Sequence, residues 1–379
     1  MKILYIGHYK EFGGWSQAAT DYILALDKNG VDVVCRNVTL TSDKEDVDSR
    51  LLALEKKDSS DCDICIQHVL PHYLVKYNKL KKNIAFFASE STSIKGLAWL
   101  ENLKMMDEVW VPNEQLKNSL IEDEIGIPVK VIPHTFELEK YKRRYGDIKV
   151  PNVEGKFKFY YIGDVNKRKN LESILACFYS EFESSEDVAL ILKVSKFGHD
   201  PKMMEELVNN LSAKVQKDVR LYRNSTDYKR PVIVPSKIKE EELYALHQYC
   251  DCFICPSHGE AWSIPSFEAM CFGNTPICSN FGGPRDFIDR NDWRTGFLAN
   301  GVSTICRCDD AAFQDLFTGR EYWFQPSEKD IKEQMRRLYN SWKKDSISYK
   351  SRNQAAGLKR AEQFSYKNVV ELMKGAINE

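Results

Sequence analysis

Strand-like and helix-like segments alternate along almost the whole chain, and this alternation limits the fold more than any other feature. Short apolar runs typical of buried strands are separated by longer segments with apolar residues at helical spacing. In the first part we expect strands at Ile3–Ile6, Val31–Val34, Ile64–Val69, Ile84–Phe87, Val109–Pro112 and Val129–Pro133. A helix from about Ser16 to Asn29 would bury Ala18, Ile23 and Leu26 on one side. The pattern predicts an α/β fold with a doubly wound parallel sheet.

The alternation breaks once and then restarts. Charged and turn residues fill the segment Glu139–Lys158, which we interpret as a linker between domains. Beyond it we expect strands at Phe157–Ile162, Val188–Val194 and Val232–Val234, and helices from about Asn170, from Pro201 and at Glu240–Tyr249, Glu328–Trp342, Tyr349–Phe364 and Tyr366–Ile377. The 379 residues, 43% of them hydrophobic, suffice for two domains. We place the first at residues 1–150 and the second at 151–363.

Charge and hydropathy exclude several classes of protein. The formal net charge is −1, so no global field draws the chain onto nucleic acid or an anionic membrane. The first apolar run, MKILYIG, is too short for a secretion signal, and no apolar run approaches the roughly 20 residues of a membrane span. We therefore expect a cytoplasmic protein without a transmembrane segment.

Cysteine and aspartate spacings raise the question of a metal. The pairs Cys62 with Cys65 and Cys252 with Cys255 lie in strand-like segments, where residues three apart face opposite sides and cannot share one ion. We interpret these cysteines as reduced, buried side chains. The D-x-D sequence at Asp61 stands at the start of a strand, the sheet end opposite to ligands. We therefore expect no metal site.

The likeliest ligand site lies in the stretch from Cys250 to Phe287. A strand at Phe253–Cys255 runs into a polar turn with Glu260, a helix opened by Pro265 carries Glu268 in its first turn, and a strand at Thr275–Ser279 follows. In an open parallel sheet, ligands collect at the carboxyl ends of strands. The loop with Glu260 stands at such an end.

This stretch also carries a resemblance to a known family. GEAWSIPSFEAM resembles the E-x7-E motif of family 4 retaining glycosyltransferases with the GT-B fold, with Glu260 and Glu268 as its two acids. Further motifs follow the family order, namely Gly13-Gly14, FFASESTS, DEVWVPNE, VIPH, YIGDVNKRKNL and FGGPRDF. The resemblance implies two Rossmann-like domains facing across a cleft, with a terminal helix at about 364–379 crossing back to the first domain.

The resemblance also implies a reaction. A sugar would pass from a UDP or GDP sugar to an acceptor hydroxyl of a glycan, lipid or small molecule, with retention and without a metal or other cofactor. A modified nucleic acid base is an alternative acceptor, against which the near-neutral charge speaks. A GT-B protein that binds nucleotide sugars with weak or no catalysis is a second alternative.

Three residues are the catalytic candidates that the resemblance identifies. Lys169 and Arg168 would offset the charge that grows on the departing diphosphate, and a basic helix start without such a ligand is disfavoured by the helix dipole. Glu260 would contact the donor sugar; without the motif it would be a surface turn residue.

The donor-binding candidates surround these three. Glu268 would accept hydrogen bonds from both ribose hydroxyls, although the helix dipole alone also favours an early carboxylate. The others, whose backbone is expected near the donor, are Gly163, Trp262, Ser263, Ile264, Val234 and Gly14. The chain departs from the family at Asp164, where arginine is frequent, and at Ala261 and Ser263, where glycine is frequent.

The acceptor-side candidates lie in the first domain. Gly13 allows a tight loop whose amides approach a phosphate or the acceptor, with an ordinary glycine turn as the alternative. Glu90 would face the cleft or else cap a loop, and His134 ends a strand near the cleft or is structural. The histidines at 8, 68, 72 and 258 give a weaker signal.

Overall fold

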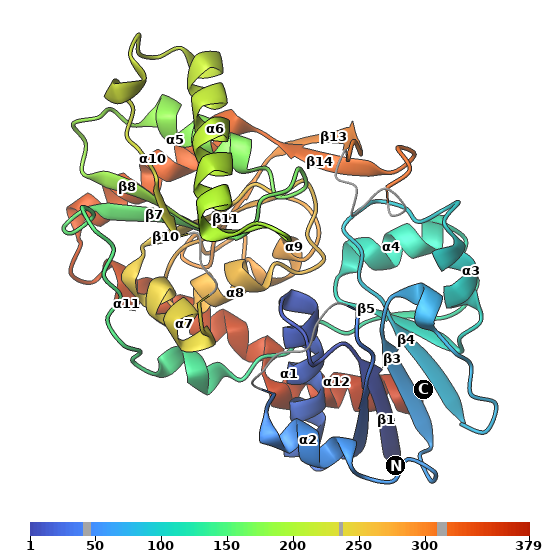
Figure 1. Ribbon diagram of the computed structural model, residues 1–379. Coiled ribbons are helices and arrows are strands. Elements are labelled where there is room, and N and C mark those ends of the chain that lie inside the picture. Colours follow the sequence, from blue (N-terminus) through green and yellow to red (C-terminus); the bar gives the residue numbers. More distant parts are fainter. Residues whose placement is uncertain (41–46, 235–237, 309–316) are drawn as a thin grey trace. The chain divides into compact units, whose positions relative to one another are not determined.

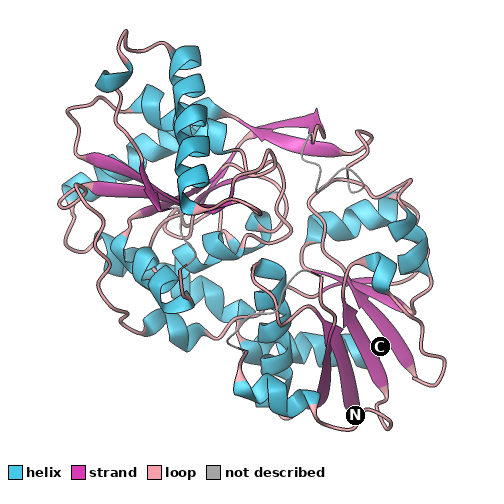
Figure 2. Cartoon of the chain, viewed as in Figure 1, coloured by secondary structure: helices cyan, strands magenta, loops and turns pink. Residues whose placement is uncertain are grey.

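The chain forms two compact units in a computed structural model that describes residues 1–40, 47–234, 238–308 and 317–379. The first unit combines Met1–Leu138 with Glu362–Glu379, and the second is Glu139–Ala361. In each unit helices pack against a parallel sheet (Figures 1 and 2).

The first unit contains a six-stranded parallel sheet with the order β2-β1-β3-β4-β5-β6. The strands are β1 (Lys2–Gly7), β2 (Asp32–Asn37), β3 (Ile64–His68), β4 (Lys82–Phe86), β5 (Glu108–Val111) and β6 (Val129–Val131). The helices are α1 (Gly14–Lys28), α2 (Ser49–Glu55), α3 (Ala98–Lys104), α4 (Glu114–Glu122) and α12 (Tyr366–Asn378). The side chains of Ala18, Ile23 and Leu26 on α1 are buried, as the helical spacing predicted.

The last helix completes the first unit. Helix α12 packs against α1, and the Phe136 N–H donates to the Phe364 carbonyl oxygen at 2.9 Å (Figure 1). Lys130 on β6 also donates to the Ala376 carbonyl oxygen at 2.6 Å. The expected return of the C-terminal helix to the first domain is confirmed.

The second unit contains a six-stranded parallel sheet with the order β12-β11-β10-β7-β8-β9. The strands are β7 (Phe157–Asp164), β8 (Val188–Ser195), β9 (Val232–Val234), β10 (Cys252–Cys255), β11 (Ile277–Ser279) and β12 (Phe297–Ala299). The helices are α5 (Leu171–Glu181), α6 (Pro201–Val219), α7 (Glu240–Tyr249), α8 (Ile264–Cys271), α9 (Pro284–Phe287), α10 (Glu328–Lys344) and α11 (Tyr349–Ala361). An antiparallel hairpin that the sequence did not predict is formed by β13 (Gly301–Ile305) and β14 (Tyr322–Pro326).

The strand order has a consequence for ligand binding. The chain builds β7, β8 and β9 outward in one direction and β10, β11 and β12 in the other, so β7 and β10 are central neighbours. A reversal of this kind leaves a crevice at the carboxyl ends of the two strands, where α/β proteins bind ligands.

The segment predicted to be a linker is packed into the second unit. Tyr141, Val150 and Val153 are buried, and the final residues of the segment already belong to β7. The charged residues suggested exposure, whereas the apolar residues between them supply core contacts.

The residues weighed as metal ligands have other partners. All eleven cysteines lie within the described residues and are free thiols, ten of them buried. Asp61 pairs with Lys2, and Asp63 pairs with Lys81 at 2.7 Å. Within the described ranges, no group of three or more His, Cys, Asp and Glu residues is placed to hold a metal ion.

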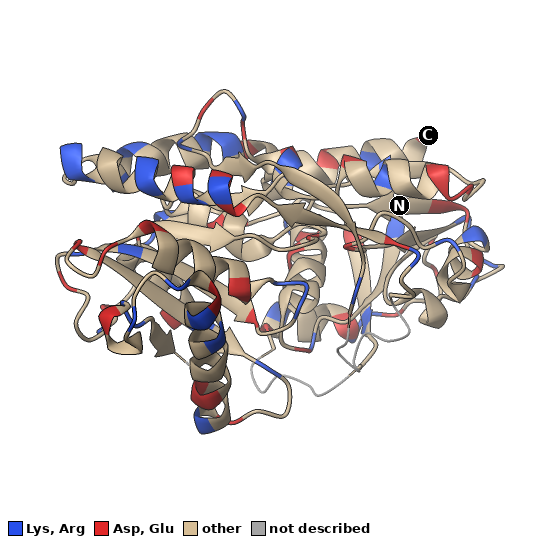
Figure 3. Cartoon of the chain, turned by 90° about the horizontal axis from the view of Figure 1, so that it is seen from above, with Lys and Arg blue, Asp and Glu red and all other residues tan. Residues whose placement is uncertain are grey.

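Charged residues of both signs are interspersed along the chain. Lys and Arg alternate with Asp and Glu along the helices and loops, in line with the net charge of −1 (Figure 3). In the described part of the chain, none of the helices has the length and apolar character that a membrane crossing requires.

Helix α8 is held by an unusually close contact with α11. A Cβ atom at Gly357 on α11 would lie 2.0 Å from the carbonyl oxygen of Met270 on α8. A Cβ atom at Gly273, just after α8, would lie 2.4 Å from the carbonyl oxygen of Lys350. Because both positions are glycine, the backbones of α8 and α11 can come into direct contact.

We expect Gly357→Ala to destabilise the protein by about 2 kcal/mol, because overpacking against a backbone atom outweighs the gain of about 1 kcal/mol in helix propensity. The matched control is Gly375→Ala on α12, where an added Cβ would meet nothing within 4 Å. The control should be neutral or stabilising. Urea unfolding measures both, and equal stability of the two variants would contradict the close contact.

Candidate functional site

Two loops of the second unit carry the predicted cations and one predicted carboxylate. Strand β7 leads through residues 165–170 into α5, and β10 leads through residues 256–263 into α8. Because the two strands are parallel neighbours, both loops leave the same edge of the sheet. Asn170 joins them: its Nδ2 donates to the Pro256 carbonyl oxygen at 3.0 Å, and its Oδ1 caps α5.

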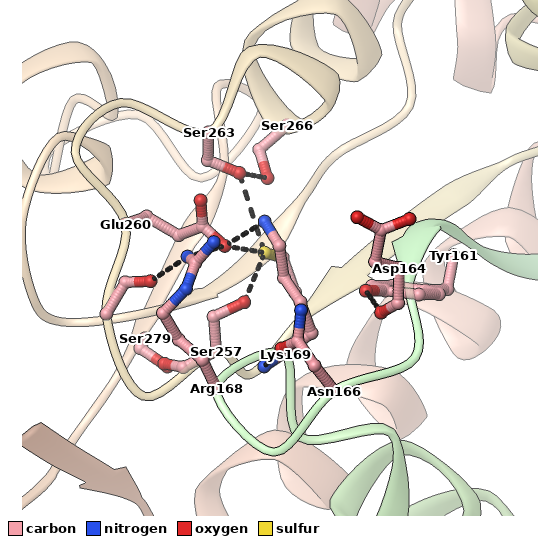
Figure 4. Close-up of polar contacts among 12 residues, drawn as sticks. Tyr161, Asp164, Asn166, Arg168, Lys169, Ser257, Glu260, Ser263, Ser266 and Ser279 are labelled. Atoms are coloured by element: carbon pink, nitrogen blue, oxygen red, sulfur yellow. Dashed lines mark hydrogen bonds and ion pairs between the residues drawn. The ribbon is translucent and has the colours of Figure 1, made fainter. Parts of the chain in front are cut away.

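The loops meet in an ion cluster formed by Lys169, Arg168 and Glu260 (Figure 4). Lys169 Nζ donates to Glu260 Oε1 at 2.6 Å, and Arg168 Nη1 lies 3.5 Å from the same oxygen. Arg168 Nη1 also donates to the Gly259 carbonyl oxygen at 2.7 Å. Glu260 is only 8% exposed, whereas both cations are half-buried. The structure therefore brings the three catalytic candidates together.

The charge state of Glu260 follows from this cluster. Burial raises the pKa of Glu260, but Lys169, Arg168 and a hydrogen bond from Ser257 outweigh it, so the pKa lies below its ordinary value of 4.5. The carboxylate is therefore ionised at neutral pH. Two cations and one anion leave the cluster with a net positive charge, which suits an anionic ligand.

Small polar side chains extend the cluster along the loop. Cys255 Sγ lies 3.3 Å from Ser257 Oγ and 3.5 Å from Ser263 Oγ, and Ser263 Oγ lies 2.7 Å from Ser266 Oγ (Figure 4). Hydroxyl groups can both donate and accept. These side chains are buried, so their contacts tie the end of β10 to the start of α8.

Ser263 has a backbone conformation that explains why glycine is frequent at this position in the family that the motif resembles. It precedes α8 with φ 72° and ψ 68°, in the left-handed region that side chains disfavour. The residue turns the chain sharply into the helix. The motif therefore keeps its backbone shape here without its glycine.

The glycines of FGGPRDF hold this loop from outside. The Gly283 N–H donates to the Glu260 carbonyl oxygen at 3.0 Å. A Cβ atom at Gly282 would lie 2.0 Å from that oxygen, and one at Gly283 would lie 2.4 Å from Trp262 Cα. Only residues without a side chain allow this approach, so the motif fixes the backbone that carries Glu260.

Asp164, which stands where arginine is frequent, is directed to the neighbouring strand. Its Oδ1 accepts from Ser195 Oγ at 2.6 Å, and its carbonyl oxygen accepts from Tyr161 OH at 3.0 Å. A Cβ atom at Gly163 would lie 2.5 Å from that Tyr161 hydroxyl oxygen. Gly163 therefore makes room for the tyrosine that supports the end of β7.

The sequence predicted Glu268 in the first turn of its helix, and this prediction was wrong. Helix α8 begins at Ile264, one residue before Pro265, so Glu268 is its fifth residue. Glu268 is 1% exposed; its Oε1 accepts from Tyr141 OH at 3.4 Å, and its Oε2 lies 3.7 Å from His247 Nε2. Burial lowers the pKa of His247, so the imidazole is neutral at neutral pH.

The remaining donor-side candidates of this unit lie around the same edge. The side chains of Trp262 and Ile264 are buried. Val234 ends β9 and is half-buried, whereas the next residue, Pro235, lies outside the described residues.

The glycine pair Gly13-Gly14 lies in the first unit at the start of α1 and is exposed. Gly13 has φ 105°, and a Cβ atom there would meet nothing within 4 Å. The next residue, Trp15, donates its indole N–H to His68 Nε2 at 2.6 Å. Because an indole can only donate, His68 accepts on Nε2 and is neutral, and this bond anchors the turn.

The two other acceptor-side candidates also lie in the first unit. Glu90 is half-buried in the loop after β4. His134 is buried, its Nδ1 lies 3.0 Å from the Tyr22 hydroxyl oxygen, and burial lowers its pKa to about 3. His134 is therefore neutral at neutral pH.

Sequence reasoning missed the support that Ser257 and His258 give to the cluster. Ser257 hydrogen-bonds to Glu260, and His258 joins both loops to strand β14. Their position directly before the motif, in PSHGE, was the one available signal.

Comparison with known proteins bears on this unit. Residues 147–304 match the family model described as glycosyl transferases group 1. This range contains β7, β10, α8 and the ion cluster. No curated protein sequence matches the chain.

Solved structures resemble the whole chain. HepE from Anabaena in complex with UDP-glucose matches with a TM-score of 0.61 and 13% identity, covering 100% of this chain and 99% of that one. An E. coli trehalose-6-phosphate protein bound with UDP-2-fluoro glucose matches with a TM-score of 0.67 and 9% identity, covering 100% of this chain and 99% of that one. A trehalose-6-phosphate synthase studied for glycosyl transfer with retention matches with a TM-score of 0.65 and 9% identity, again covering 100% of this chain and 99% of that one. The chain has the GT-B fold of two α/β domains.

We expect Lys169→Met to lower stability by about 3 kcal/mol at neutral pH, because it leaves a buried carboxylate without its closest cation. The depressed pKa of Glu260 contributes stability that is present above pH 4.5 and lost at lower pH. The difference in free energy of unfolding between the variant and the wild type should therefore become smaller as the pH falls below about 4.5, because protonated Glu260 needs no cation.

Urea unfolding at several pH values measures this gap. The control is Lys81→Met, whose ammonium pairs with Asp63 at 2.7 Å but is 79% exposed. It should cost about 0 to 1 kcal/mol. A Lys169 variant no less stable than this control would show that the buried pair does not form.

Proposed function

We propose that the protein is a glycosyltransferase that moves a sugar from a nucleotide diphosphate sugar to an acceptor hydroxyl. The observation that carries the proposal is the ion cluster of Lys169, Arg168 and Glu260, at the carboxyl ends of two central strands and within the matched family region. A UDP sugar is the favoured donor, because two of the similar structures hold UDP-glucose or its fluorinated analogue. A GDP sugar is the alternative.

The chemistry explains why cations are needed there. When the bond between the sugar C1 and the diphosphate oxygen breaks, negative charge accumulates on the departing diphosphate. Fixed positive groups placed beforehand stabilise that charge without reorganising. Lys169 has three N–H donors and can keep its bond to Glu260 while it donates to a phosphate oxygen.

The carboxylates have different parts in the proposal. Glu260 accepts hydrogen bonds from the donor sugar and holds Lys169 in place. Glu268 accepts from the ribose hydroxyls after the bond from Tyr141 OH yields, and at 3.4 Å that bond is weak enough to exchange. Gly163, Val234 and the backbone of residues 262–264 complete donor binding, and Gly14 is proposed to assist.

The acceptor and the stereochemistry follow from the resemblance. We assign acceptor binding to Gly13, Glu90 and His134, and an acceptor that is a glycan, lipid or small molecule. The acceptor oxygen forms the new bond to C1 on the face that the diphosphate leaves, and its proton passes to the departing phosphate oxygen. This route retains configuration and needs no metal. One of the similar structures was studied for transfer with retention.

A second candidate is a protein that binds nucleotide sugars without transferring the sugar. Asp164 favours it, because a cation frequent in the family is replaced by an acid. Nucleotide binding without sugar release from any donor would identify this alternative.

We expect UDP to raise the melting temperature, because a ligand that binds only the folded state at 100 times its dissociation constant stabilises it by about 2.7 kcal/mol. Thermal shift against UDP, GDP, ADP and their glucose conjugates identifies the nucleotide. Melting temperatures that no nucleotide changes would contradict the donor site.

We expect Lys169→Met to lower kcat by about 10² to 10³, as loss of one charge-stabilising group does elsewhere. The double variant Lys169→Met with Glu260→Gln should regain part of the lost stability, since the buried carboxylate is removed while Arg168 keeps its bond to the Gly259 carbonyl oxygen, and it should still be slow. Lys214→Met, on α6 with an exposed partner Glu172, is the matched control. The measurement is the initial rate of sugar transfer below the melting temperature of each variant. A double variant as fast as the wild type would show that the ion cluster takes no part in the reaction.

A further inference from the structure

His258 connects both loops of the ion cluster to the hairpin β13–β14. Its backbone N–H donates to the Arg168 carbonyl oxygen at 2.7 Å, and its carbonyl oxygen accepts from the Phe324 N–H at 2.9 Å. Its Nδ1 lies 2.9 Å from the Phe324 carbonyl oxygen. A carbonyl only accepts, so His258 carries a proton on Nδ1 and donates it to β14.

Aromatic packing strengthens this connection. The His258 ring stacks on Trp323 with 5.5 Å between centroids and 4° between planes, and Trp323 is only 2% exposed. Phe324, the next residue on β14, stacks on Phe281 at 5.8 Å. Phe281 directly precedes Gly282, which closes on the backbone of Glu260. Strand β14 therefore touches both segments that hold the carboxylate.

The hairpin is an addition to the sheet rather than part of it. Strands β13 and β14 form their own two-stranded sheet and extend away from the six-stranded one (Figure 1). The family match ends at residue 304, inside β13, so β14 lies beyond the matched region.

We propose that β13–β14 is a positioning element for the donor site, and that His258 is the positioning residue through which it holds Arg168 and Glu260 in place. The inference rests on the proposed transferase function. His258 acts through its neighbours: it fixes the carbonyl of Arg168, next to Lys169, and stands two residues before Glu260. Loops that carry charged groups need such support, because small misplacements of catalytic groups are costly.

Two substitutions at His258 separate positioning from packing. His258→Phe keeps a ring to stack on Trp323 but loses the donor to the Phe324 carbonyl oxygen. His258→Asn loses the ring but places an amide N–H close to the position of Nδ1. We expect kcat to fall about 10-fold to 100-fold in His258→Phe with a smaller change in donor KM, and to recover to within about threefold in His258→Asn.

Two variants on neighbouring residues of β14 test the hairpin itself. Trp323→Leu removes the stacking partner and, like the loss of the ring in His258→Asn, should lower kcat by no more than about threefold. Tyr322→Leu is the matched control, because Tyr322 points to the opposite face and is 49% exposed. It should leave kcat unchanged. Equal effects of the two variants would overturn the role of the stack.

Hydrogen exchange of the ligand-free proteins gives a readout that does not need activity. Amides of residues 165–170 and 256–263 should exchange at least tenfold faster in His258→Phe than in the wild type or in His258→Asn. If the wild type transfers no sugar, the proposed function fails, while exchange still decides whether the hairpin holds the loops. The inference would be overturned if His258→Phe had the kcat and the amide exchange rates of the wild type. It would also be overturned if His258→Asn lost as much kcat as His258→Phe.

Discussion

The salt bridge between Lys169 and Glu260 is the interaction on which the site depends. It joins a loop after β7 to a loop after β10, two segments far apart in the sequence. Taking a carboxylate out of water is expensive, and an ion pair repays this only with good geometry and further hydrogen bonds. Arg168 and Ser257 provide them here. Stability alone would be served as well by apolar side chains, so the proposed function, in which these charges meet a charged ligand, gives the pair a second role.

Close backbone contacts give this ion pair a fixed frame. Gly282 and Gly283 bring one segment against the loop of Glu260, and Gly357 brings α11 against α8. At each of these positions even a methyl group would collide with a backbone atom. Backbone contacts have few alternative arrangements, whereas side-chain contacts can change rotamer. The frame therefore holds the carboxylate before any ligand arrives, which is the condition for electrostatic stabilisation without reorganisation.

The sequence predicted the parts of the structure that depend on local pattern. The alternation of strands and helices is confirmed, because apolar periodicity reports on it, and the GT-B fold that the motif resemblance implied is confirmed as well. Glu268 was placed in the wrong turn, because proline was taken as the first helical residue and Ile264 precedes it. Hairpin β13–β14 was missed because its strands are short, β13 is largely exposed, and residues 306–321 separate the two strands.

The supporting residues could not be predicted for a related reason. His258 owes its role to Phe324 and Trp323, more than sixty residues away, and no local pattern announces a contact of that separation. Gly357 is similar, since a glycine within a helical pattern suggests weakness in the helix and not a partner across it. The roles of such residues depend on contacts with residues distant in the sequence, and these contacts are known only when the fold is known.

Asp164 shows how charge is balanced around the cluster. Its carboxylate is exposed and accepts from Ser195, so water screens its charge, whereas the charges of the ion cluster are partly buried and screened less. A phosphate in contact with Lys169 would therefore experience mainly the two cations. With no cation at position 164, the proposed donor site has Lys169 and Arg168 as its positive charges. The positions of these two cations then matter more, and under the proposal above the hairpin β13–β14 holds the loops that carry them.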